Sequence, residues 1–137
     1  MNLEIIEGRT LAPKGLKKVE AIIRPDRLQP VQDALDALGA SGITITEVLG
    51  CGHQRGYTEH YRGTKANISL QRKVKVEVVI PDDRAEGVVE AIAGAARTGE
   101  VGDGKIFVIP VEDAVRIRTG ERGDDIVQHR VPDHWGH

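Results

Sequence analysis

The chain has 137 residues and a mass of 14.9 kDa, which is the size of a single domain. Its formal net charge is −2, whereas nucleic-acid-binding domains usually carry a basic excess, so the charge argues against a nucleic-acid partner. The single cysteine, Cys51, excludes an intrachain disulfide. No secretion signal and no apolar run near the roughly 20 residues that span a bilayer is present, so we expect a soluble, cytoplasmic protein without membrane insertion.

The first part of the chain predicts an extension, a strand and a helix. Residues 1–16 read as an N-terminal extension. Residues 17–24 are apolar and β-branched, which is typical of a strand. Apolar side chains then recur with helical spacing up to Gly39, and Asp26 with Gln29 predicts a capping pair at the start of this helix.

The middle of the chain predicts two strands separated by a long loop. Residues 43–49 alternate threonine with apolar side chains, which indicates a second strand. Residues 50–71 are polar and rich in glycine, and they are too many for an ordinary hairpin connection, so we expect a functional loop. Residues 73–80 predict a third strand, and residues 82–96 predict a second helix with one apolar face.

The last predicted elements follow a second glycine-rich segment. Residues 98–105, the glycine-rich turn, lead into a fourth strand at residues 106–109. Residues 115–118 alternate apolar side chains with arginine and predict a short fifth extended segment, whereas residues 122–137 read as a polar C-terminal tail. The two halves repeat strand, helix and strand, which predicts an α+β ferredoxin-like sandwich in β-α-β-β-α-β order.

The composition also bears on assembly. Only 3% of the residues are aromatic, so the core must be built from valine, isoleucine, leucine and alanine. A four-stranded antiparallel sheet with both helices on one face leaves its other face uncovered. We therefore expect a homo-oligomer that covers this second face.

Two features have the chemistry of a phosphate site. The glycine-rich turn reads Thr-Gly-Glu-Val-Gly-Asp-Gly-Lys, and such glycines let backbone N–H groups approach an anion. It is not a Walker A loop, because no Ser or Thr follows the lysine; a plain tight turn is the alternative. Arg116 and Arg118 are two apart in a predicted strand, so both guanidinium groups would project from one face and bind phosphate, or form a solvated edge.

Several segments together resemble the PII signal-transduction proteins. They are residues 17–25, 46–63, 98–108 and 115–121, in the family's order and spacing. The resemblance spans residues 17–121, which we take as the PII ferredoxin-like domain. It implies a homotrimer in which ATP and ADP compete for clefts between subunits, and in which a long T-loop projects from each subunit toward a target enzyme or membrane transporter.

The resemblance also implies a nucleotide site, position by position. The adenine would contact Thr44, Glu77 and the backbone at Val79, while Arg116 and Arg118 would reach the phosphates from an adjoining subunit. The full set implied for the nucleotide is Ile22, Thr44, Gly50, Gly52, His53, Gln54, Glu77, Val79, Gly102, Asp103, Gly104, Lys105, Arg116 and Arg118.

A second ligand is implied beside the nucleotide. Gln54 would hold both Mg²⁺, bound together with ATP, and the co-ligand 2-oxoglutarate. Lys73 would pair with a carboxylate of this oxo acid. The residues implied for the co-ligand are Gln54, Arg55, Gly56 and Lys73.

Two positions depart from the family's pattern. Ala66 stands where many bacterial members have a uridylylated tyrosine, so this modification cannot occur there. His53 stands where the family commonly has an arginine that reaches the phosphates, and a neutral imidazole supports the charge of ATP less well. The alternative interpretation is therefore a divergent PII-like sensor of ADP or AMP, linked to bicarbonate, carbon or metal transport.

An enzyme and a metal carrier are two alternatives to a sensor. We expect that the protein is not an enzyme, because neither a Ser-His-Asp set nor paired carboxylates suited to acid–base catalysis can be identified. A metal carrier would use Cys51, His53 and His60, although their spacing matches no standard zinc or copper site. The histidines of the tail are a further candidate for metal binding, namely His129, His134 and His137.

Overall fold

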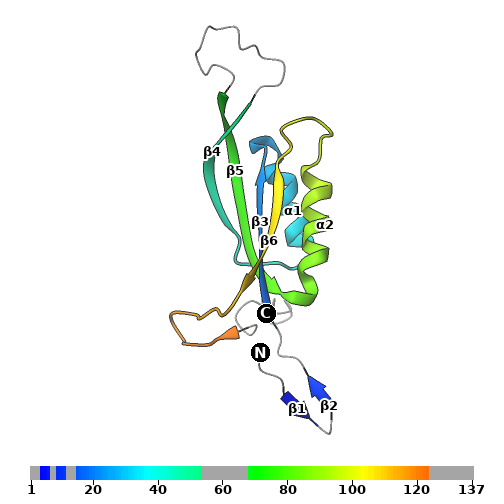
Figure 1. The fold of residues 1–137 in the computed structure, drawn as a ribbon, viewed down its shortest axis with the longest axis vertical. Coiled ribbons are helices and arrows are strands. Elements are labelled where there is room, and N and C mark those ends of the chain that lie inside the picture. Colours follow the sequence, from blue (N-terminus) through cyan, green and yellow to red (C-terminus); the bar gives the residue numbers. More distant parts are fainter. Residues whose placement is uncertain (1–3, 7–8, 12–14, 54–67, 124–137) are drawn as a thin grey trace, which may run out of the picture.

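Figure 1 shows the computed structural model, which describes residues 4–6, 9–11, 15–53 and 68–123. The strands and helices in chain order are β1 (Glu4–Ile6), β2 (Arg9–Leu11), β3 (Leu16–Ile23), η1 (Pro25–Arg27), α1 (Leu28–Ala37), β4 (Thr44–His53), β5 (Ile68–Pro81), η2 (Asp82–Arg84), α2 (Ala85–Ala96) and β6 (Lys105–Val111). The elements η1 and η2 are short 3-10 helices. None of the helices in these ranges is long and apolar enough to cross a membrane.

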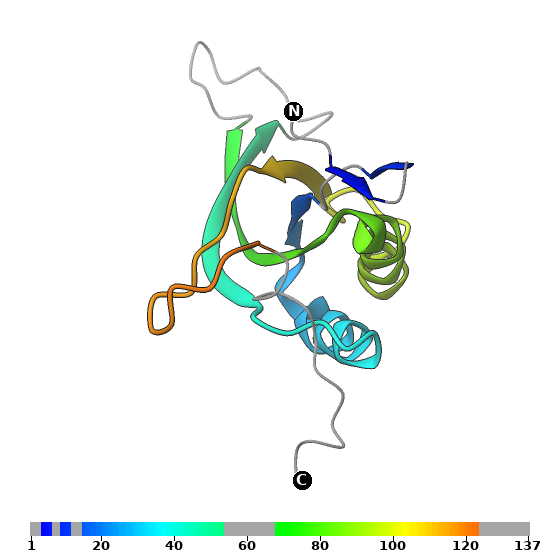
Figure 2. The same ribbon diagram turned by 90° about the horizontal axis from the view of Figure 1, so that it is seen from below.

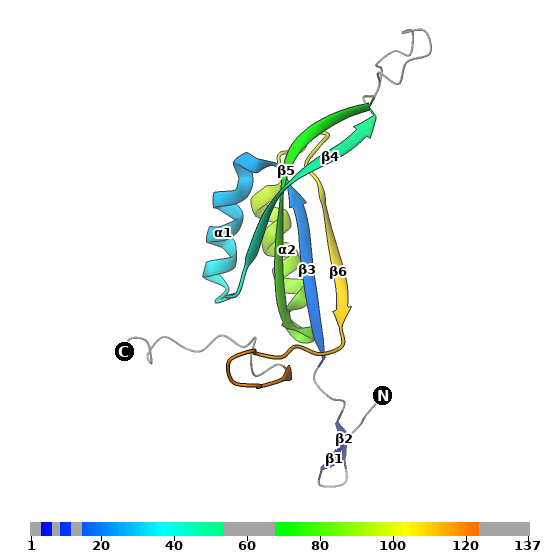
Figure 3. The ribbon, with the colours of Figure 1, turned by 90° about the vertical axis from the view of Figure 1, so that its left-hand side faces the viewer.

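The main sheet has four strands in the order β4-β5-β3-β6, and each neighbouring pair is antiparallel. Both helices lie on one face of this sheet, as Figures 2 and 3 show, and they pack against each other. This arrangement confirms the predicted α+β ferredoxin-like sandwich. We call the face without helices the open face.

The core lies between the sheet and the two helices. Because side chains alternate along a strand, every second residue of β3 and β5 points under the helices. The helices contribute residues at helical spacing, and no polar or charged side chain of the described residues is buried with them. The best buried of these residues are Ile23, Leu35, Ile92, Val19, Val31, Val76, Val78 and Val88. The core is aliphatic, as the composition predicts.

The strands that flank the predicted loop are longer than expected. β4 continues to His53 and β5 begins at Ile68, so residues 50–53 and 68–71 form a two-stranded ribbon, paired through Gly50 and Gln71. In Figures 1 and 3 this ribbon extends beyond the helices. A ribbon without helices on either face needs no apolar alternation, which is why the pattern indicated a loop.

The start of α1 also differs from the prediction. Asp26 lies in η1 and does not cap the helix; the N-cap position is Arg27, which has no side-chain capping bond. Gln29 instead donates to Asp33 at 2.9 Å, one turn further along the helix. The predicted capping pair is wrong because a 3-10 turn precedes the helix and shifts its start. Gly39 has a φ of 76° and follows the helix end, as predicted.

The predicted fifth strand is absent from the described residues. Val115 forms only an isolated bridge with Arg122, and residues 117–119 form a turn. The Arg116 amide donates to the Glu121 carbonyl at 2.8 Å, which closes this small loop. Arg118 therefore lies in a turn, and the prediction that it shares one strand face with Arg116 is wrong. Gly120 has a φ of 76°, which lets the chain reverse direction there.

The N-terminal extension contains a short hairpin that the sequence did not predict. β1 pairs with β2 in a separate two-stranded sheet, which lies beyond the start of β3 in Figure 1.

Candidate functional site

Strand register decides which of the predicted residues lie together. Residues directly opposite each other on paired strands share a face of the sheet. Thr44 on β4 faces Glu77 on β5, Glu77 faces Glu20 on β3, and Glu20 faces Phe107 on β6. Glu20 alternates with the buried side chain of Val19, so this row lies on the open face.

The same alternation of side chains along each strand places many of the predicted ligand-binding residues on the open face. The strands thus gather residues from four separate stretches of sequence on one surface. The predicted residues at open-face positions are Ile22, Thr44, Gly50, Gly52, Lys73, Glu77, Val79 and Lys105.

Glu77 is held by a lysine that the sequence analysis did not single out. The ammonium group of Lys18 donates to Glu77 at 2.8 Å and lies 3.4 Å from Glu20. The hydrogen bond from Lys18 lowers the pKa of the Glu77 carboxyl, and the same bond raises the pKa of Lys18. Glu77 therefore remains an ionised acceptor at neutral pH. Lys18 is next to the buried Val19 on β3, so its charged side chain points to the opposite face of the sheet. A lysine at such a position is the signal that could have identified it.

Asp103 shapes the glycine-rich turn from within. Its carboxylate accepts hydrogen bonds from the backbone amides of Thr98 at 2.8 Å and Gly99 at 2.9 Å, and from the Thr98 hydroxyl. Arg24 Nε donates to the same carboxylate at 2.9 Å. These bonds, the Thr98 hydroxyl first and Arg24 second, hold the pKa of Asp103 well below its usual range. The Asp103 carboxylate is thus hydrogen-bonded to groups of the turn and to Arg24.

Two glycines of the turn occupy positions where a side chain would be strained. Gly102 and Gly104 both have a φ of 102°, in the region that other residues rarely adopt. A Cβ atom on Gly104 would lie 1.8 Å from the carbonyl oxygen of Ile22, and one on Gly102 would lie 3.3 Å from Arg24 Nη2. The turn can therefore pack this closely against the end of β3 only with glycine at both positions.

Two basic side chains hold the carbonyl groups of this turn. Arg24 Nη2 donates to the carbonyl of Val101 at 2.7 Å, and Lys73 Nζ donates to the carbonyl of Gly102 at 2.5 Å. Lys73 was predicted for the co-ligand, so the structure brings the two predicted sites into direct contact. Arg24 was missed by the sequence analysis; its position at the end of the first predicted strand, directly before Pro25, is the signal that could have identified it.

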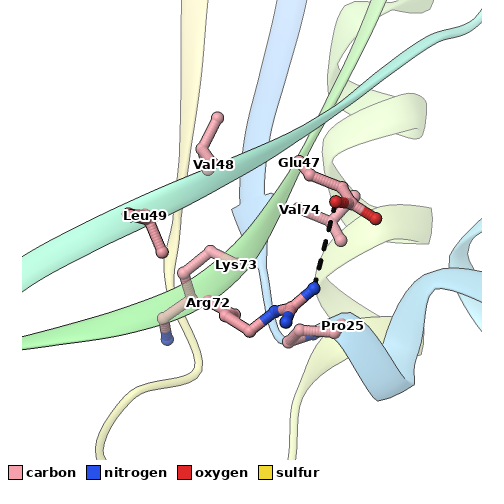
Figure 4. Close-up of a pocket in the computed structure, with 7 residues that line it drawn as sticks. All are labelled: Pro25, Glu47, Val48, Leu49, Arg72, Lys73 and Val74. Carbon is pink, nitrogen blue, oxygen red and sulfur yellow. Dashed lines mark ion pairs between the residues drawn. The ribbon is translucent and has the colours of Figure 1, made fainter.

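A pocket of about 380 Å³ lies at the base of the β4–β5 ribbon, on the side of the helices (Figure 4). Within it, Arg72 and Glu47 form a loose ion pair at 4.0 Å. Lys73 extends away from this pair in Figure 4, toward the glycine-rich turn. Among the predicted site residues that the structure describes, only Lys73 lines the pocket. Its lining is Pro25, Glu47, Val48, Leu49, Arg72, Lys73 and Val74.

Arg116 and Arg118 are not brought to the glycine-rich turn of their own chain. β6 runs from Lys105, next to the turn, to Val111, and the segment that carries both arginines follows that far end in Figures 1 and 3. That they act in the site of an adjoining subunit stays a prediction.

Some predicted residues cannot be placed. Gln54, Arg55, Gly56 and Ala66 lie outside the described residues, as do His60 and the three histidines of the tail. His53 ends β4 and Cys51 is exposed. Within the described ranges, no group of three or more His, Cys, Asp or Glu side chains is placed to hold a metal ion.

Comparison with known proteins agrees with this arrangement. The family model "Nitrogen regulatory protein P-II" matches residues 16–121. Proteins of that name from Cereibacter sphaeroides and Rhizobium meliloti (strain 1021) are each 54% identical over 112 residues, which is 82% of this chain and 100% of theirs. The crystal structure of Arabidopsis thaliana PII bound to citrate is similar with a TM-score of 0.66 at 43% identity, and covers 81% of this chain and 91% of that one. The chain therefore belongs to the nitrogen regulatory protein P-II family.

Proposed function

We propose that the protein is a cytoplasmic signalling regulator that binds ATP or ADP together with 2-oxoglutarate in clefts between the subunits of a homotrimer. Its T-loop, between β4 and β5, contacts a target enzyme or a membrane transporter and controls it without turnover of a substrate. The single observation that carries this proposal is that strand pairing gathers many of the predicted nucleotide residues on the open face, beside the glycine-rich turn.

The chemistry of this surface suits an adenine nucleotide. Glu77 provides an ionised carboxylate that can accept from the amino group of adenine, and Thr44 lies directly opposite it. The glycine-rich turn offers backbone N–H groups to the phosphates, and Lys105 at its end adds a positive charge.

A second subunit is needed to complete this site. Arg116 and Arg118 follow the far end of β6, away from the glycine-rich turn of their own chain, and in this proposal they supply guanidinium groups to the cleft of a neighbour. Phe107 and Ile109 leave 46% and 36% of their surface exposed on the open face. Covering them in a trimer would remove apolar surface from water and would place the neighbour at the cleft.

The co-ligand site rests on a lysine and on a residue beyond the described ranges. Lys73 supplies a cation for a carboxylate of 2-oxoglutarate, and the citrate bound to Arabidopsis thaliana PII is likewise a carboxylate ligand. Mg²⁺ bound with ATP would offset phosphate charge, and a Gln54 side-chain oxygen is of the kind that this hard cation prefers.

Calorimetric titration with ATP, ADP and AMP, each with and without Mg²⁺ and 2-oxoglutarate, tests the proposal. We expect ATP and ADP to bind, and 2-oxoglutarate to bind only together with MgATP. Phosphate release should stay at background throughout. The absence of binding by every nucleotide would contradict the proposal.

His53 supports a second candidate, a sensor that prefers ADP or AMP over ATP. An imidazole at position 53 offers less charge to a triphosphate than the guanidinium group of an arginine does. His53→Arg should then raise the affinity for ATP by about tenfold, the scale of one charge-assisted hydrogen bond, and change that for ADP much less. Equal gains for both nucleotides in the same titration would rule this candidate out.

A further inference from the structure

We propose that Lys73 is a positioning residue for the glycine-rich turn, which it holds in its ligand-ready shape before any ligand binds. The same ammonium group then serves both ligand sites. This inference rests on the proposed function for the identity of the ligands, but the contact itself joins two segments of this chain.

The contact spans a long distance in sequence. Lys73 lies within β5, opposite Val48 of β4, and its ammonium group reaches the carbonyl of Gly102 at 2.5 Å. Arg24, at the end of β3, holds the preceding carbonyl, that of Val101, at 2.7 Å. Two successive carbonyls of the turn are therefore anchored by cations from two different strands.

These anchors orient the backbone. In a planar trans peptide the carbonyl and the following N–H point in opposite directions. Because Arg24 holds the carbonyl of Val101, the N–H of Gly102 in the same peptide points away from Arg24. A turn that binds an anion needs its N–H groups aimed outward in this way.

Lys73 adds to the Asp103 contacts that already shape the turn, whose own closing backbone bond is weak. The Asp103 amide donates to the carbonyl of Glu100 at 3.3 Å, beyond the usual range for such bonds. Gly102, at the third position of this four-residue turn, has the positive φ of a type II turn. The charged contact from Lys73 is shorter and involves an ionised donor, so it contributes more to the order of the turn.

One ammonium group can serve both sites at once. It carries three N–H donors, so the bond to Gly102 leaves donors for a carboxylate of an oxo acid. A carboxylate bound to Lys73 would then lie directly beside the carbonyl that sets the shape of the turn. This gives a physical link between the co-ligand and the phosphates of the nucleotide.

Lys73→Met tests the inference, because it keeps the length of the side chain and removes the donors. Arg72→Met is the matched control: it also removes one positive charge, but its side chain faces the helix side of the sheet and is 78% exposed. The readout is the exchange rate of the Asp103 amide in the ligand-free protein, measured by NMR relative to the amides of β3. The β3 amides report whether a variant is folded to the same extent.

We expect Lys73→Met to raise the relative exchange rate of the Asp103 amide by about tenfold, the scale of one hydrogen bond to a charged group, and Arg72→Met to leave it unchanged. An unchanged rate in Lys73→Met overturns the inference, even if nucleotide affinity falls, because loss of charge alone would explain that fall. A failure of the wild-type protein to bind ATP or ADP would contradict the proposed function and leave the exchange result to decide this inference.

Discussion

The two faces of the central sheet differ in how far their side chains are buried within this chain. The helix-covered face is buried within one chain: Val19, Val76 and Val78 are at most 1% exposed, and their neighbours are apolar. The open face carries paired charges and half-exposed apolar side chains such as Phe107. One strand supplies both faces, with Val19 on one and Lys18 on the other.

Because of this difference, substitutions on the two faces should affect different properties of the protein. A substitution on the covered face acts on folding, because it leaves a cavity or strain in a packed interior. A substitution on the open face or in the glycine-rich turn should act on assembly and on ligand binding, because we propose that a neighbouring subunit and a nucleotide cover those surfaces. The following predictions test this division.

The largest effect is expected from Leu35→Ala on the covered face. Leu35 is fully buried in α1, so its truncation should lower the free energy of unfolding by about 3 kcal/mol through lost burial and an unfilled cavity. Urea unfolding at fixed protein concentration measures this. Leu38→Ala, at the exposed end of the same helix, is the control and should cost much less. Similar losses for both would show that the core is not where the structure locates it.

Gly104→Ala should have the next largest effect, and it should abolish nucleotide binding. The new Cβ would collide with the Ile22 carbonyl and would sit on a backbone with a positive φ, a strain of about 2 kcal/mol. Calorimetry with ADP and urea unfolding measure the two effects. Gly94→Ala in α2 is the control, because open space surrounds it and alanine favours a helix, so its stability should rise slightly. Normal ADP binding by Gly104→Ala would contradict the role given to this turn.

Phe107→Asp should weaken assembly more than folding. Phe107 lies on the open face with 46% of its surface exposed, so a charge there would enter the proposed contact between subunits. Sedimentation velocity at micromolar concentration should show a shift from trimer to smaller species. Leu70→Asp makes the same change on the helix side of the β4–β5 ribbon and should leave the trimer intact. A trimer that survives Phe107→Asp would place the subunit contact elsewhere.

The smallest effect concerns pH. The pKa of Asp103 is lowered in the folded protein, first by the Thr98 hydroxyl and then by Arg24, so its contribution to stability is present above the ordinary value of 3.8. That contribution is lost as the pH falls through the depressed value. Asp103→Asn should therefore lower the melting temperature by a constant amount from pH 7 to pH 5, and the difference should shrink below pH 3.8. Asp36→Asn, on the surface of α1, serves as the control. A difference that grows on acidification would contradict the assignment.

Local patterns were enough for most of the fold. Residues 17–24, which are apolar and β-branched, predicted β3, and residues 73–80 predicted the covered part of β5; the helices bury every second side chain there. The same patterns failed where a strand has no cover, in the ribbon at residues 50–53 and 68–71, and where a turn closes on itself around Arg116. In both places backbone hydrogen bonds decide the structure, and these leave little trace in hydrophobic spacing.

By itself, the sequence predicted the family and the order of the four strands of the main sheet and the two helices. Those features follow from local periodicity and from motifs that are contiguous in the chain. Only the tertiary structure decided that Lys18 holds Glu77, that Asp103 turns inward, and that Arg24 and Lys73 hold one turn. These contacts join residues between 29 and 79 positions apart, and only the pairing of strands brings such side chains within reach of each other.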